Sequence, residues 1–185
     1  VGDELAAKWS AGARLTVALM HAGAADNGLD LIRGGLEASE QDTSYLVGRL
    51  NRPKPRIGLG LALSAVATSS IDVSDGLLAD LGHILRESGS LGAIVDVSCL
   101  PLSLQAVGAC GESLARQKAL TGGDDYEICF TASPTQRSQI EQLRDNCNVK
   151  LTCIGSVRMV AGIALTGTDN QDLTGIKSGY RHDWP

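Results

Sequence analysis

The segment from Ile71 to Leu85 constrains the fold most strongly, because it predicts a strand, a tight turn and a helix in immediate succession. Ile71 and Val73 alternate around Asp72 and favour a short strand. Asp75 is a typical N-cap residue, and apolar residues then recur at helical spacing over 77–85. A strand that passes through an acidic turn into an amphipathic helix is typical of α/β architecture.

Helices and strands alternate irregularly along the rest of the chain. We expect further strands at 15–19, 93–97, 126–131, 149–157 and 159–165, and helices at 26–36, 39–50, 57–67, 102–110, 114–119 and 133–144. This order favours an α/β (α+β) sandwich over an all-α or all-β fold. The sequence contains no uninterrupted apolar run of the length that a membrane span needs.

Composition and charge exclude several classes of protein. With 185 residues, 43% of them hydrophobic, and a formal net charge of −5, the chain suits a folded domain and argues against disorder and nucleic-acid binding. Residues 49–56, RLNRPKPR, hold four cations that could meet phosphates. A proline-rich basic run is more often a solvated connector, and we expect that role here.

Cysteine and histidine usage indicates the cellular setting and limits the metal chemistry. The five cysteines include no C-x-x-C pair and are odd in number, which argues against a disulfide framework or a cysteine zinc site. Cys129 and Cys153 lie in apolar runs and are expected to be small buried residues. A reducing, cytoplasmic setting fits best, and no signal-peptide pattern opens the chain. The scattered histidines imply that any metal would have oxygen ligands.

The first candidate site is the acidic turn after the strand at 71–73. Asp72 and Asp75 are three residues apart across a sharp turn, so both carboxylates can point into one space. Mg²⁺ commonly takes one or two carboxylates together with substrate phosphates. The helix N-terminus, and Ser74 through its hydroxyl or backbone N–H, could bind a phosphate. Considered alone, the commoner roles would be a helix cap for Asp75 and a turn former for Asp72.

The second candidate site is the turn over 122–127, GGDDYE. Paired glycines there precede paired carboxylates at the start of a strand. Glycines would let a ligand approach the backbone closely, and the carboxylates could accept hydrogen bonds from it. An ordinary solvated loop explains the composition equally well. The sequence carries no P-loop, nucleophile-elbow or H-E-x-x-H motif.

Four elements, in their order and spacing, resemble the thiamine-monophosphate kinase family. They are R-P-x-P-R at 52–56, D-V-S-D-G-L-L-A-D-L at 72–81, G-G-D-D-Y-E at 122–127 and the late Gly-Tyr pair at 179–180. The resemblance implies the C-terminal domain of the aminoimidazole ribonucleotide synthetase-like superfamily, with partial ferredoxin-like topology, over 14–185. Residues 1–13 would be the tail of a missing N-terminal domain that binds ATP and Mg²⁺.

The resemblance also implies an activity and a set of site residues. The activity is ATP- and Mg²⁺-dependent phosphoryl transfer to thiamine monophosphate, giving thiamine diphosphate, by a cytoplasmic protein that is a homodimer when full length; the fragment alone would be inactive. The implied residues are Asp72 and Asp75 as metal ligands, Ser74 as an ATP contact, and Asp124 and Tyr180 as substrate contacts, with Glu127 and Trp184 as second candidates.

The turn over 23–29 keeps only part of the family's Gly-Asp-Ala-Ala-Gly-Leu pattern, so no ATP contact is carried over there. The alternatives are another ATP-dependent member of the same superfamily and a non-catalytic ligand-binding module.

Overall fold

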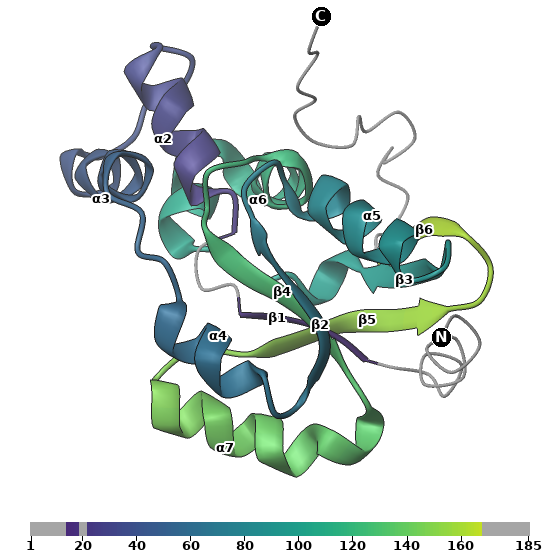
Figure 1. The fold of residues 1–185 in the computed structure, drawn as a ribbon. Helices are drawn as coiled ribbons and strands as arrows, with labels where there is room; N and C mark the ends of the chain where they lie inside the picture. Colours follow the sequence, from purple (N-terminus) through teal and green to yellow (C-terminus); the bar gives the residue numbers. More distant parts are fainter. Residues whose placement is uncertain (1–13, 19–21, 168–185) are drawn as a thin grey trace, which may run out of the picture.

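The computed structural model describes residues 14–18 and 22–167, which form one mixed sheet with helices on both faces (Figure 1). The strands are β1 (Arg14–Ala18), β2 (Ala67–Val73), β3 (Gly92–Asp96), β4 (Glu127–Ala132), β5 (Thr152–Arg158) and β6 (Gly162–Thr166). Their order in the six-stranded sheet is β2-β4-β1-β5-β3-β6. Neighbouring strands run antiparallel, except for the parallel pair β3 and β6.

The helices pack in three apolar clusters, one on each face of the sheet and a third among α2, α3 and α6. They are α2 (Ala24–Ile32), α3 (Glu40–Asn51), α4 (Ile57–Leu63), α5 (Leu77–Glu87), α6 (Leu104–Thr121) and α7 (Arg137–Cys147), with short 3-10 turns at Val97–Cys99 and Pro134–Gln136. The leucine stripe of α5 packs on one face of the sheet, and α4 and α7 pack around Phe130 on the other. No helix among the described residues is long and apolar enough to cross a membrane.

The predicted α/β class is confirmed, and the elements differ from expectation where tertiary packing intervenes. The helix expected at 57–67 ends at Leu63, because residues from Ala67 onward extend β2. The helices expected at 102–110 and 114–119 are joined in α6, which is kinked at Gly111. Strand β4 is buried almost throughout, since helices cover both faces of the sheet at this position.

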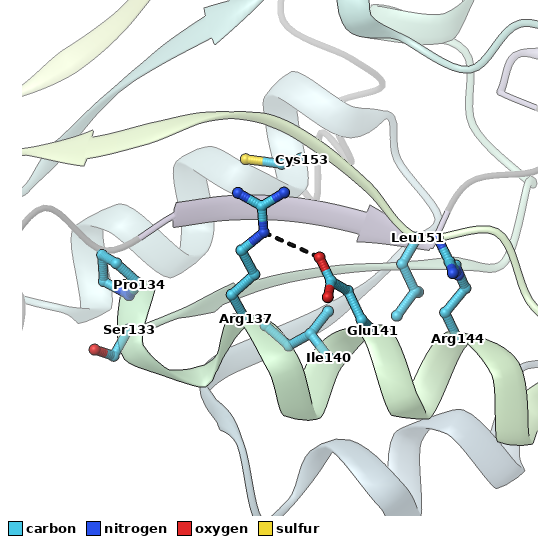
Figure 2. Close-up of a pocket in the computed structure, with 8 residues that line it drawn as sticks. All are labelled: Ser133, Pro134, Arg137, Ile140, Glu141, Arg144, Leu151 and Cys153. Carbon is cyan, nitrogen blue, oxygen red and sulfur yellow. Dashed lines mark hydrogen bonds and ion pairs between the residues drawn. The ribbon is translucent and has the colours of Figure 1, made fainter.

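Only one of the two cysteines predicted to be buried is buried. Cys129 is inaccessible, and burial raises the pKa of its thiol to about 12. Cys153 is exposed instead. It lines an open pocket of about 540 Å³ beside α7, together with Arg137 and Glu141 (Figure 2). Successive side chains of β5 point to opposite faces of the sheet, so Cys153 points away from the core that contains its neighbour Ile154.

The basic run at 49–56 does connect α3 to α4, but two of its arginines are not solvated as expected. Arg49 is 8% exposed and lies 3.2 Å from the carboxylate of Glu127, which is 0% exposed. Arg56 donates two hydrogen bonds to the same carboxylate, at 2.8 and 2.9 Å. The bond with Glu127 raises the pKa of the Arg56 guanidinium. This ion cluster anchors the α3–α4 connection to the first residue of β4.

We predict that Glu127→Gln lowers the free energy of unfolding of this chain by about 3 kcal/mol, because it leaves two arginines facing a neutral group. Urea unfolding measures the effect. Glu141→Gln is the control, since it breaks the exposed Arg137–Glu141 pair on α7 (Figure 2) and should cost less than about 1 kcal/mol. Equal losses in the two variants would contradict the anchoring role of the cluster.

Candidate functional site

The topology of the sheet brings the two acidic turns together. Strand β2 pairs antiparallel with β4, so that Asp72 lies opposite Ile128 and Val73 lies opposite Glu127. The chain therefore leaves the end of β2 where it enters the start of β4. The turn at 73–76, which we call the first turn, lies beside the turn at 121–126, which we call the second turn. Local sequence gives no sign of this pairing.

Backbone contacts join the two turns directly. The amide of Asp124 donates to the carbonyl of Ser74, and the amide of Tyr126 donates to the carbonyl of Val73, both at 2.9 Å. A Cβ at Gly123 would lie 2.4 Å from the carbonyl oxygen of Ser74. The expectation that the paired glycines admit a ligand is thus wrong for Gly123: the backbone that approaches it belongs to the first turn.

Gly76 makes the reciprocal contact from the first turn. Its φ is 115°, a conformation that favours glycine, and a Cβ there would lie 2.6 Å from the carbonyl oxygen of Thr121. Gly76 is also the N-cap residue of α5, so the prediction that Asp75 caps this helix is wrong. Asp75 lies one residue earlier, in the turn itself, where its side chain is half-buried.

Asp80 holds the first turn from within α5, a role that the sequence analysis missed. Its side chain is 2% exposed, and Oδ2 accepts hydrogen bonds from the amides of Ser74 at 2.9 Å and Asp75 at 3.1 Å. Burial raises the pKa of Asp80, the two hydrogen bonds oppose this, and the charges of Asp75 and Asp72 add to it. Three carboxyl groups are therefore within electrostatic reach of one another at this turn.

In the second turn, one carboxylate of the Asp pair faces inward. Asp125 is 2% exposed and accepts hydrogen bonds from the amides of Gly23 at 2.6 Å and Ala25 at 3.2 Å, at the N-terminus of α2. Burial raises its pKa to about 7, an effect that the two hydrogen bonds partly oppose. Asp125 is thus a structural anchor for α2, and only Asp124 remains exposed to a ligand.

The backbone on either side of Asp125 is strained. Asp124 has a φ of 62° and Tyr126 a φ of 50°, values in the left-handed region that non-glycine residues rarely adopt. Such conformations cost about 1–3 kcal/mol each and cluster at functional sites. The strain here accompanies the alternation that buries Asp125 while Asp124 is exposed.

The structure places four of the predicted site residues where β2 ends and the two turns adjoin: Asp72 is the penultimate residue of β2, Ser74 and Asp75 lie in the first turn, and Asp124 lies in the second. Glu127, the second candidate for a substrate contact, is fully buried with both carboxylate oxygens bound to arginines, and is not available to a ligand. Tyr180 and Trp184 lie outside the described residues, as does the expected tail at 1–13.

The carboxylates at the end of β2 and in the first turn are donors of the type that Mg²⁺ takes. Asp72 and Asp75 supply hard carboxylate oxygens, and the charges of both raise the pKa of Asp80, which places each of them within electrostatic reach of Asp80. Across residues 14–18 and 22–167, no cluster of three or more His, Cys, Asp or Glu could hold a metal ion by itself. Two carboxylates that share the ion with phosphate oxygens are a common arrangement for Mg²⁺.

We predict that Gly123→Ala lowers the free energy of unfolding by about 1–3 kcal/mol, because the added methyl group would push the first turn away. Gly48→Ala is the matched control, since a Cβ at Gly48 in α3 has nothing within 4 Å. Urea unfolding of both variants measures the difference. A Gly123→Ala variant as stable as the control would show that the two turns are not in close contact.

We predict that the Asp125 carboxyl makes stability fall as pH rises. Its pKa is about 7 in the folded chain and near the ordinary value of 3.8 when unfolded, so its stabilising contribution is full below pH 3.8 and is lost as pH rises through 7. Between pH 5 and pH 8 the free energy of unfolding should fall by about 2 kcal/mol more in the wild type than in Asp125→Asn. Urea unfolding at both pH values measures this, and parallel pH profiles would contradict it.

Comparison with known proteins gives the family. No model of a known protein family matches the chain. The thiamine-monophosphate kinase of Haemophilus influenzae is 43% identical over 135 residues, which are 73% of this chain and 41% of that kinase. The crystal structure of the thiamine-monophosphate kinase of Stenotrophomonas maltophilia is 40% identical, with a TM-score of 0.80 over 86% of this chain and 52% of that one.

A second solved structure, AaThiL complexed with AMPPCP and TMP, is 27% identical, with a TM-score of 0.71 over 92% of this chain and 51% of that one. The chain thus spans about half the length of the relatives that it matches. Both the sequence and the fold of this chain match those of the relatives over most of its length. Within the half of the relatives' length that it spans, this chain belongs to the thiamine-monophosphate kinase family.

Proposed function

We propose that this chain is part of a longer kinase that transfers the γ-phosphoryl group of ATP to thiamine monophosphate, giving thiamine diphosphate. Residues 14–185 would be its C-terminal domain, with the aminoimidazole ribonucleotide synthetase-like fold and partial ferredoxin-like topology, and residues 1–13 would end the preceding domain. The observation that carries the proposal is the adjoining position of the two turns, which carry Ser74, Asp75 and Asp124, beside Asp72 at the end of β2. A relative whose solved structure contains AMPPCP and TMP supports the two substrates.

The first turn would bind the nucleotide. Asp72 and Asp75 would hold Mg²⁺, which when bound would neutralise phosphate charge. The backbone amide of Ser74 already donates to Asp80, so its hydroxyl is the group that would donate to a phosphate oxygen of ATP. The sequence had left both the hydroxyl and the backbone amide of Ser74 open as donors, and the hydroxyl is the one we propose. The nearby N-terminus of α5 adds the positive end of a helix dipole.

The second turn would bind the acceptor. Asp124 is exposed beside the first turn and would accept a hydrogen bond from thiamine monophosphate, and Tyr180 would stack on the substrate rings. The acceptor phosphate is already ionised, so the reaction needs no general base from the protein. The residues of the two turns would act by positioning the reactants in line and by stabilising charge, with no covalent enzyme intermediate.

Two alternatives have different outcomes in assays. Another ATP-dependent member of the same superfamily would use a different acceptor, which product analysis across phosphorylated acceptors would reveal. A non-catalytic ligand-binding module would bind nucleotide without turnover. Because this chain spans only about half the length of its relatives, we expect the isolated chain to be inactive and to behave as such a binding module.

We predict that Asp75→Asn in the full-length protein lowers thiamine diphosphate formation by about 10²-fold or more, because a neutral amide would replace a metal-binding carboxylate. The melting temperature should stay close to that of the wild type, since the side chain lies outside the apolar cores. Glu87→Gln, at the exposed end of the same helix region, is the control and should leave turnover unchanged. Normal turnover by Asp75→Asn would remove the proposed metal role.

A further inference from the structure

Asp80 is a buried acid that the proposed reaction does not use directly. It lies in the first turn of α5, four residues after the N-cap Gly76, with 2% of its surface exposed. Its Oδ2 atom accepts both the Ser74 amide and the Asp75 amide. A buried carboxylate is costly unless its oxygens find donors, and here the donors are the backbone of the turn that carries the candidate ligands.

The position of Asp80 explains how the first turn keeps its shape. Helix α5 has no side-chain cap at Gly76, whose φ is 115°. In a capping box, a side chain in the first turn of a helix accepts a hydrogen bond from a backbone amide at the start of that helix. Asp80 does this across a longer span, and it closes the loop from Ser74 back onto α5. Without an acceptor at this point, two buried or half-buried amides would lack their partner and the turn could adopt other conformations.

The geometry argues against Asp80 as a metal ligand itself. Its Oδ2 is occupied by two amide donors, and the residue is almost inaccessible to solvent. Asp72 is exposed and Asp75 is half-buried, so these are the carboxylates that an incoming ion can reach. Asp80 is therefore placed to act on the site through the backbone that carries them, and not as a ligand.

We propose that Asp80 is a positioning residue that fixes the amides of Ser74 and Asp75, and so holds the carboxylates of Asp72 and Asp75 in the arrangement that binds the metal–nucleotide complex. The proposal rests on the proposed function for the identity of that complex. Groups that orient metal ligands commonly contribute 10- to 100-fold to metal affinity, and Asp80 should act in that range.

The test compares Asp80→Ala with Asp80→Asn. Both hydrogen bonds end on one oxygen atom, so the amide oxygen of asparagine can accept both, whereas alanine accepts neither. Leu81→Ala is the stability control, because it empties a buried position on the same helix and removes neither of the hydrogen bonds that Asp80 accepts. The readouts are calorimetric titration of Mn²⁺ with AMPPCP on the full-length protein, and amide hydrogen exchange of Ser74 and Asp75 in this chain by NMR.

We expect Asp80→Ala to weaken Mn²⁺ binding by roughly tenfold or more and to speed exchange at both amides. Asp80→Asn should stay within about threefold of the wild type in affinity, with the two amides still protected. Leu81→Ala should lower the melting temperature and leave Mn²⁺ binding unchanged. This ordering separates hydrogen-bond acceptance by Asp80 from its charge and from a general loss of stability.

Two results would overturn the inference. Equal Mn²⁺ affinity in Asp80→Ala and the wild type would show that the hydrogen bonds do not position the ligands. Asp80→Asn as weak as Asp80→Ala would show that the charge of Asp80 acts, rather than its acceptor oxygen. Failure of the proposed function looks different: the full-length protein would make no thiamine diphosphate, while Mn²⁺ affinity and amide exchange kept the expected order.

Discussion

The close backbone contact between the turn at 73–76 and the turn at 121–126 is the constraint on which the rest of the site depends. Two amide–carbonyl hydrogen bonds join the turns, and Gly76 and Gly123 each lie where a side chain would meet the opposing backbone. The contact follows from the antiparallel pairing of the edge strand β2 with β4, in a sheet covered by helices on both faces. Two segments that are far apart in the sequence, each with acidic residues, thereby lie next to each other.

The dense acidic motifs divide into buried anchors and exposed groups. Asp80 binds two amides of the first turn, Asp125 binds two amides of α2, and Glu127 binds two arginines. Each of these buried carboxylates has donors that offset the cost of removing its charge from water. The carboxylates that remain accessible are those of Asp72, Asp75 and Asp124. The anchors thus fix the backbone that carries the accessible groups.

The features that could be predicted from the sequence are the local ones. The 3.6-residue spacing over 77–85 predicted α5, and the alternation of Ile71 and Val73 predicted a strand that contains Asp72 and leads into the turn of Asp75. The resemblance of four motifs predicted the family, which the relatives confirm. The roles of Asp72, Ser74, Asp75, Asp124 and Tyr180 stay predictions, because no ligand contact tests them.

The features that could not be predicted depend on partners distant in the sequence. The contact of Gly123 with Ser74 arises from strand order, and the ion pair of Glu127 with Arg49 arises from the position of α3 beside the start of β4; periodicity reveals neither. Asp75 looked like a helix cap because its residue type favours that role, but Gly76, with a φ of 115°, is the N-cap residue and Asp80 supplies the acceptor. The presence of an acid four residues into α5, directed back toward the turn, was the one local signal available for that role.

The central claim is that these two turns belong to a kinase that phosphorylates thiamine monophosphate. The most direct measurement follows transfer of labelled phosphate from γ-labelled ATP, with the full-length protein, Mg²⁺ and thiamine monophosphate, beside parallel reactions that contain EDTA or other phosphorylated acceptors. We expect labelled thiamine diphosphate only in the reaction with Mg²⁺ and thiamine monophosphate. Labelling of a different acceptor, or none in any reaction, would contradict the claim.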